Sequence, residues 1–387
     1  MAKRRRQAGP DPRQFDLFAM APQAAAPVLP TPTPATTTQL PTPPPPPTTA
    51  AALTQPQPIA HLVDGDRKHR IARRSAVELA ELAVEAWYSG HVGDDIAIPM
   101  GVVAGLTQLR KTATDGTDTA SFILGLDKRA LLKFHQHIWS HLWIRHPYLV
   151  EMSRPIHEWL NQEKGPPAKV IDAVHTVTHA AIRNGLFHIA GDPDPAMRSD
   201  TDLLGTMLTR MRSEGKRAAL AEIHTPPEVA DLMASVLFRP DGMQPGQWID
   251  DPAAGTGGLL RAAALAMRMR GMNPHEFGWS MTEIDPIAAA CAAVNALVWG
   301  LGRNVLIYVG DTLTTGDAAS RAYKHRKAVE AHHERVMEAS ISAANWMVAI
   351  RKVQTLIGKV EESPSTPGRP GRGGHLGAAA QTHVAST

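Results

Sequence analysis

A glycine-rich segment at residues 251–258 (DPAAGTGG) constrains the possible folds of this chain more than any other part of its sequence. A short apolar stretch, 247–250, precedes it and an alanine-rich amphipathic stretch, 259–269, follows it, which predicts a strand, a turn and a helix in that order. Glycine lets the backbone turn tightly and approach a ligand without a clash from Cβ, and the first turn of a helix offers free N–H groups. The pattern therefore predicts a ligand-binding turn in an α/β fold.

The alternation of strands and helices continues after this turn. Residues 277–282 and 304–309 have the pattern of strands, and residues 286–299 between them have the pattern of a helix. A β-α-β-α-β order favours a parallel sheet, and ligands bind such sheets beside the carboxyl ends of the strands. We therefore expect a partial Rossmann-like sheet with its ligand site at the glycine-rich turn.

Acidic residues follow all three predicted strands. Asp251 follows the first, Glu283 and Asp285 follow the second, and Asp311 follows the third. A carboxylate in the position of Glu283 can accept hydrogen bonds from both hydroxyls of a ribose, as in dinucleotide sites. A single glycine-rich turn often only closes a loop, but three strand ends with such residues favour a binding site.

The chain before this sheet has helical spacing. Apolar residues recur at intervals of three and four in 76–87, 99–109, 131–142 and 170–189, which predicts an all-helical domain over 70–195, ahead of an α/β domain over 200–360. Fifteen of the 32 prolines lie between Pro10 and Pro58, and no charged residue occurs from 19 to 60. Such a segment buries too few apolar groups to offset the entropy of ordering, so residues 1–65 are predicted to be a disordered tail, as are residues 361–387.

The overall composition excludes several classes of protein. The 40 Lys and Arg nearly balance the 37 Asp and Glu, so the net charge of +3 excludes a wholly polybasic or acidic protein. Cys291 is the one cysteine, which excludes a disulfide within the chain and suits a reducing compartment. No run of 18 apolar residues occurs, and no hydrophobic signal core follows the basic N-terminus. We expect a soluble, cytoplasmic protein without a membrane span.

Histidines gather in the predicted helical domain: His135, His137, His141, His146 and His157. His137 and His141 would share one helical face, as two ligands of a metal site do. Neither a cysteine nor an acidic residue lies at ligand spacing from them, so core and surface histidines are favoured and no metal site is predicted.

Residues 251–260 (DPAAGTGGLL) resemble the S-adenosylmethionine motif of adenine-N6 DNA methyltransferases, especially the modification subunits of type I restriction-modification systems. The fourth residue of that motif is commonly cysteine in the family and is Ala254 here. Four further segments resemble, in order, the start of a leading helix, the cofactor-embracing segment, the second motif and the third motif: 202–205 (DLLG), 225–230 (TPPEVA), 283–286 (EIDP) with Asn295 and Gly300, and 310–313 (GDTL). The resemblance covers about 202–313, and this family places a helical domain before its methyltransferase domain.

The resemblance implies that S-adenosylmethionine is the cofactor and that nine residues bind it: Thr225, Pro226, Asp251, Pro252, Gly255, Gly257, Glu283, Asp285 and Asp311. The two glycines would admit the methionine part of the cofactor, and the Thr-Pro pair would lie against the same end. Glu283 would hold the ribose hydroxyls, Asp311 the adenine amino group and Asp251 the amino group of the methionine part. Carboxylates also favour a cationic sulfonium electrostatically.

The catalytic loop of this family, Asn or Asp-Pro-Pro followed by Tyr or Phe, does not follow Asp311 in this sequence. In the family that loop accepts the amino protons of adenine and stacks on the flipped base. Residues 320–338 instead predict a charged helix and residues 341–360 an apolar one, with no fourth strand. We therefore assign no catalytic residue, and we expect either that a partner chain completes the sheet or that only the cofactor half is present.

An apolar cluster in the proline-rich tail, Gln14, Phe15, Leu17 and Phe18, cannot belong to a local core. The segment QFDLF resembles the pentapeptide with which bacterial DNA-processing proteins bind the replication sliding clamp, and a plain spacer is the alternative.

The sequence thus favours an S-adenosylmethionine-binding protein of the adenine-N6 DNA methyltransferase type, which methylates DNA if a catalytic loop is supplied. The alternative is a catalytically inactive cofactor- and DNA-binding module tethered to the replication machinery. A methyltransferase for small molecules is a third hypothesis, which the 225–228 segment disfavours because it belongs to the DNA branch.

Overall fold

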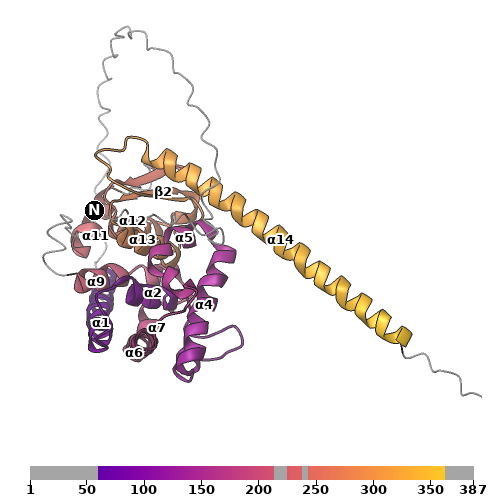
Figure 1. The fold of residues 1–387 in the computed structure, drawn as a ribbon. Helices are drawn as coiled ribbons and strands as arrows, with labels where there is room; N and C mark the ends of the chain where they lie inside the picture. Colours follow the sequence, from indigo (N-terminus) through magenta and orange to yellow (C-terminus); the bar gives the residue numbers. More distant parts are fainter. Residues whose placement is uncertain (1–59, 213–224, 238–242, 362–387) are drawn as a thin grey trace, which may run out of the picture. The chain divides into compact units, whose positions relative to one another are not determined.

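The computed structural model describes residues 60–212, 225–237 and 243–361, all within one compact unit of the chain (Figure 1). The segment QFDLF, which resembles a clamp-binding pentapeptide, and most of both predicted tails lie outside the described residues. No helix among the described residues is long and apolar enough to span a membrane.

Helices make up the described chain before residue 212, as the apolar spacing predicts. They are α1 (Ala60–Ser89), α2 (Ala97–Leu106), α3 (Thr119–Leu124), α4 (Lys128–Arg145), α5 (Pro147–Met152), α6 (Ala168–Arg183), α7 (Leu186–Ile189), α8 (Pro195–Arg198) and α9 (Leu203–Met211), with 3-10 turns at Arg154–Ile156 and Glu158–Asn161. Helix α1 begins inside the segment that the sequence assigns to the N-terminal tail. Helix α2 is buried, and a Cβ on Gly101 would come within 1.6 Å of the Ile156 carbonyl oxygen, so glycine permits the close approach there.

A three-stranded parallel sheet follows, in the order β1-β2-β3. Its elements are α11 (Pro227–Leu237), β1 (Trp248–Asp251), α12 (Gly258–Met269), a 3-10 turn (Pro274–Glu276), β2 (Gly278–Glu283), α13 (Pro286–Val298) and β3 (Val305–Val309). Asp251 pairs with Met281, and Glu283 pairs with Val309. The predicted β-α-β-α-β order is therefore confirmed, with each strand within one residue of its predicted limits.

Helices lie on both sides of this sheet (Figure 1). α12 and α13 follow β1 and β2 as crossovers, and the beginning of α14 (Ala318–Glu361) packs against β3 and β2. α13 also contacts α2, α5 and α9. The sheet and the preceding helices therefore share one continuous buried core, and the boundary between two domains at about residue 200 stays a prediction.

The C-terminal helical residues form one helix where the sequence predicts two. Residues 339–341 are Ala-Ser-Ile, so neither glycine nor proline breaks the helix between the predicted segments. The hydroxyl of Ser340 donates to the carbonyl oxygen of Val336 at 2.8 Å, which leaves the helical backbone ladder intact at this point.

A tyrosine hydroxyl occupies part of the outer edge of β3. Tyr148, in α5, donates to the carbonyl oxygen of Ile307 at 3.0 Å and accepts from the Ile307 N–H at 2.9 Å. One buried hydroxyl therefore satisfies both backbone groups that Ile307 turns away from β2. No local pattern in the sequence indicates this contact, which joins residues 159 positions apart.

Candidate functional site

A pocket of about 160 Å³ opens at the carboxyl end of β1. The glycine-rich turn, α9, the start of α11 and the start of α12 form its wall. Of the nine residues predicted to bind a cofactor, Thr225, Asp251 and Gly255 line it directly. The predicted position, beside the turn and at the carboxyl end of a strand, is therefore where the structure has a pocket.

The two predicted glycines of the turn have different surroundings. Gly255 has a φ of +54°, and a Cβ there would meet nothing within 4 Å, so the backbone faces open space. Gly257 has a φ of +91°, precedes α12, and a Cβ there would lie 3.1 Å from the ring of Trp299. Gly255 therefore exposes backbone to a ligand, whereas Gly257 allows the turn to pack on the core.

Asp251 contributes a buried carboxylate to the pocket. Its Oδ1 accepts a hydrogen bond from the Ala253 N–H at 3.1 Å. Burial raises the pKa of Asp251, and the negative charges of Asp250 and Glu283 raise it further. A cationic group bound beside Asp251 would offset the cost of keeping this carboxylate ionised.

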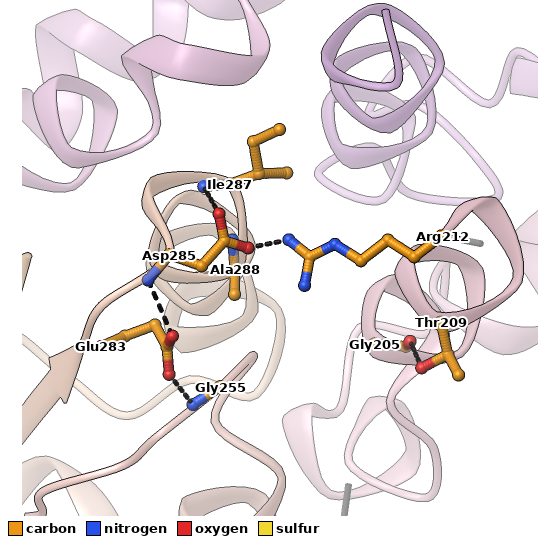
Figure 2. A network of polar contacts seen from close by, with 8 residues as sticks. All are labelled: Gly205, Thr209, Arg212, Gly255, Glu283, Asp285, Ile287 and Ala288. Atoms are coloured by element: carbon orange, nitrogen blue, oxygen red, sulfur yellow. Dashed lines mark hydrogen bonds and ion pairs between the residues drawn. The ribbon is translucent and has the colours of Figure 1, made fainter. Parts of the chain in front are cut away.

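Glu283 connects the end of β2 to the glycine-rich turn (Figure 2). Its Oε2 accepts from the Gly255 N–H at 2.7 Å, and its Oε1 accepts from the Asp285 N–H at 2.8 Å. The side chain therefore fixes the turn that lines the pocket.

Asp285 is occupied by structural contacts (Figure 2). It caps α13 by accepting from the N–H groups of Ile287 and Ala288, each at 3.2 Å. It also forms an ion pair with the buried guanidinium of Arg212, which follows α9. These contacts join α9 to α13, and Asp285 does not line the pocket.

The remaining predicted residues lie around the pocket without lining it. Pro226 accepts from the N–H groups of Val229 and Ala230 at the start of α11. The carbonyl of Pro252 accepts from the hydroxyl of Thr312, and Asp311 accepts from the Leu313 N–H at 2.9 Å. The Pro252 contact brings the segment after β3 to the turn after β1.

A polar clamp that the site prediction omitted holds the wall of the pocket. Asp202 Oδ1 accepts from the Gly205 N–H at 2.8 Å and from Asn295 Nδ2 at 2.9 Å, and Oδ2 accepts from the hydroxyl of Thr256. Asn295 also donates to the carbonyl of Thr256 at 2.9 Å. The clamp therefore joins α9, the glycine-rich turn and α13. Asp202 and Asn295 stand in the resembling motifs, and the Asp202-to-Gly205 capping pattern was the available signal.

A buried arginine that no sequence pattern indicated positions α11 over α12. Arg261 donates to Asp231 in α11 at 2.7 Å and to the carbonyl of Ser199 at 2.8 Å. Its position in an alanine-rich helix gave no sign that it is buried. This ion pair fixes the helix that follows Thr225, one of the pocket residues.

Two of the five histidines belong to the core of the helical region. His135 is buried and bonds the hydroxyl of Thr178 at 3.0 Å, and burial lowers its pKa to about 4. His157 stacks on Trp139 with ring centroids 4.3 Å apart and bonds the Val150 carbonyl. Within the described ranges, no group of three or more His, Cys, Asp or Glu is arranged to hold a metal ion.

Comparisons with known proteins find similarity in the part of the chain that forms this site. Residues 200–339 match the family model described as N-6 DNA Methylase. The chain is also similar to a crystal structure of the type I restriction-modification system methyltransferase subunit from Streptococcus thermophilus, with 16% sequence identity and a TM-score of 0.41. That similarity covers 63% of this chain and 59% of the subunit, so the chain spans less than two thirds of its length. A search of curated proteins finds no match. The residues that match the N-6 DNA Methylase model, 200–339, contain the glycine-rich turn and all three strands.

Proposed function

We propose that the pocket at the end of β1 binds S-adenosylmethionine for methyl transfer to adenine N6 in DNA, with the catalytic loop supplied by a second polypeptide. The observation that carries this proposal is the buried carboxylate of Asp251 beside the open backbone of Gly255. The carboxylate favours a ligand with a cationic group, and the glycine lets another part of that ligand lie against the backbone of the turn.

The residues of the pocket fit the cofactor that the family uses. S-adenosylmethionine supplies a methyl group on a cationic sulfur, next to an amino-acid end with an ammonium group. Asp251 would hold the ammonium, and Gly255 and Thr225 would lie against the methionine part. Glu283 would meet the ribose hydroxyls at the end of β2, and Asp311 follows the neighbouring strand end.

Calorimetric titration with S-adenosylmethionine tests the cofactor part of this proposal. Wild-type protein should bind it, and Asp251→Asn should weaken binding about tenfold or more because an ion pair to the ammonium is lost. Asp250→Asn is the matched control, since Asp250 is exposed on the same strand and does not line the pocket. No binding by the wild type up to about 1 mM would refute the cofactor proposal.

The DNA part needs a separate measurement. Labelled methyl transfer to DNA should be absent for the purified chain alone and should appear when a polypeptide with the Asn/Asp-Pro-Pro-Tyr/Phe loop is added. Transfer by the chain alone, abolished by Glu283→Ala, would overturn the requirement for a second polypeptide.

A second candidate function is a catalytically inactive cofactor- and DNA-binding module. The absence of the catalytic tetrapeptide from the sequence favours it, and the segment at Gln14, Phe15, Leu17 and Phe18 would tether it to the sliding clamp. A pull-down with purified clamp, with Phe18→Ala as control, tests the tether. Loss of binding in the variant supports it, and equal or absent binding by both proteins rejects it.

A further inference from the structure

A buried arginine joins one wall of the pocket to the segment that follows β2 (Figure 2). Arg212 directly follows α9, its side chain is 4% exposed, and its guanidinium forms an ion pair with the carboxylate of Asp285. Helix α9 lines the pocket through Gly205 and Thr209. A change at Arg212 therefore acts on a wall of the pocket and on the end of β2 together.

Two hydrogen bonds continue from this ion pair to the glycine-rich turn (Figure 2). The Asp285 N–H donates to Glu283 Oε1 at 2.8 Å, and the Gly255 N–H donates to Glu283 Oε2 at 2.7 Å. The Asp285 side chain is held both by Arg212 and by the start of α13, which it caps. The backbone of Asp285 is thereby fixed, and its N–H sets the direction of the Glu283 carboxylate.

The helix cap alone does not explain the ion pair. Asp127 caps α4 through two backbone N–H groups while fully exposed, so a cap of this kind functions in water without a buried cation. Burial of a guanidinium costs desolvation free energy that an ion pair regains only in part, so stability is a poor explanation for Arg212. The cost indicates a role in fixing one arrangement of the side chains around it.

Carboxylates near Glu283 repel one another. Burial raises the pKa of Asp251, and the negative charges of Asp250 and Glu283 raise it further. The guanidinium of Arg212 contacts Asp285 beside this group and offsets part of the repulsion. Without it, Glu283 would have a further uncompensated negative charge as its neighbour.

We propose that Arg212 is a positioning residue for the cofactor: by holding Asp285 it directs the Glu283 carboxylate toward the ribose hydroxyls. Asp285, which the sequence predicts to bind the cofactor, acts through Glu283 and does not touch the ligand. The inference rests on the proposed function, because it assumes the role that is proposed there for Glu283.

Hydrogen exchange of the purified, ligand-free chain tests the positioning by itself. In Arg212→Met the Gly255 amide should exchange about tenfold faster, because Glu283 no longer has a fixed direction. The Trp279 amide, at the other end of the sheet, should exchange as in the wild type and serves as the reference within the same sample.

Arg198→Met is the matched control. Arg198 is similarly buried and donates to the Val298 carbonyl at the opposite end of α13, so the variant loses a buried arginine without touching Asp285. Its Gly255 amide should exchange as in the wild type. If Arg212→Met does not fold because Asp285 is left as an unpaired buried charge, the double variant Arg212→Met with Asp285→Asn removes both charges and takes its place.

Titration with S-adenosylmethionine and with its 2′-deoxy and 3′-deoxy analogues tests the effect on the cofactor. Loss of a hydroxyl should weaken binding to the wild type about tenfold or more, because a hydrogen bond to a carboxylate is lost. In Arg212→Met this ratio should fall to about twofold or less, whereas Arg198→Met should keep the wild-type ratio. A purely structural role would weaken binding of all three ligands by one factor and leave the ratio unchanged.

Asp285→Asn separates an indirect role from a direct one. Asparagine still caps a helix but loses the ion pair, so this variant should match Arg212→Met in both measurements. The double variant should bind no more weakly than either single variant, because both act through the same contact. A larger loss in Asp285→Asn than in Arg212→Met would show that Asp285 binds the cofactor itself, and would overturn the inference.

Other results also decide against it. An unchanged Gly255 amide or an unchanged hydroxyl ratio in Arg212→Met overturns the inference, and so does an equal change in Arg198→Met. Wild-type protein that binds S-adenosylmethionine but does not distinguish the analogues rejects the ribose role of Glu283 and this inference, while the cofactor site stands. No binding by the wild type rejects the proposed function, and exchange at Gly255 still decides whether Arg212 positions the turn.

Discussion

Substitution of Asp202 should destabilise the protein more than the loss of an ordinary helix cap. Asp202 accepts three hydrogen bonds, from the Gly205 N–H, from Asn295 and from the hydroxyl of buried Thr256. Loss of the cap costs about 1 kcal/mol, and loss of a bond to a charged group costs about 1.5–3 kcal/mol. In the variant the Asn295 amide keeps its hydrogen bond to the Thr256 carbonyl and loses only the one to Asp202, so this contact adds less than a full bond to the cost. We expect Asp202→Ala to lower the free energy of unfolding by about 3–4 kcal/mol.

Urea unfolding at pH 7, followed by far-ultraviolet circular dichroism, measures this difference. Asp127→Ala is the matched control, because Asp127 caps α4 through the N–H groups of Arg129 and Ala130 and is fully exposed. The control therefore measures the free energy lost with a helix cap alone, when no hydrogen bond between separate elements is removed. If the two variants lose the same stability, the clamp does not join α9 to the glycine-rich turn as described, and the reasoning is refuted.

Three further predictions follow from other buried polar groups. Because the pKa of Asp251 is raised in the folded protein, keeping this carboxylate ionised costs stability at neutral pH. Asp251→Asn should therefore raise the Tm at pH 7, and thermal scans at lower pH should show this increase in Tm becoming smaller toward about pH 4. Tyr148→Phe leaves both backbone groups of Ile307 without their hydrogen bonds, so the free energy of unfolding in urea should fall by about 2–4 kcal/mol and the Ile307 amide should exchange its hydrogen faster. The control Tyr323→Phe, at an exposed ring, should change neither quantity. Burial lowers the pKa of His135 to about 4, so as the pH falls from about 6.5 the unfolded chain takes up this proton first and the folded state loses about 3 kcal/mol of stability. His135→Gln should therefore flatten the fall in the free energy of unfolding toward acid pH, measured by urea titrations at a series of pH values. An unchanged dependence on pH would contradict the assignment.

Patterns that are short along the chain predicted the sheet and the position of the pocket. The glycine-rich turn and its flanking strand and helix occupy about twenty consecutive residues, so spacing alone locates Asp251 and Gly255 at a strand end. The same local signals gave the three strands and their order.

Contacts between distant residues were beyond such patterns. Asn295 bonds Asp202 across 93 positions, and Tyr148 bonds Ile307 across 159, and no periodicity encodes either pairing. The sequence likewise favoured a ligand-binding role for Glu283, which stays a prediction, and it did not indicate that Glu283 accepts from the Gly255 and Asp285 N–H groups. Residue type indicated a carboxylate at a useful strand end, and only the fold defines which donors it meets.

The hydroxyl of Tyr148 also bears on solubility. Exposed strand edges nucleate aggregation, because they recruit further chains through backbone hydrogen bonds. Since this hydroxyl occupies the edge at β3, overproduced chain should self-associate through the edge at β1, where β1 offers only four residues. Very short edge strands are one way in which proteins limit such pairing, so the length of β1 restricts this association.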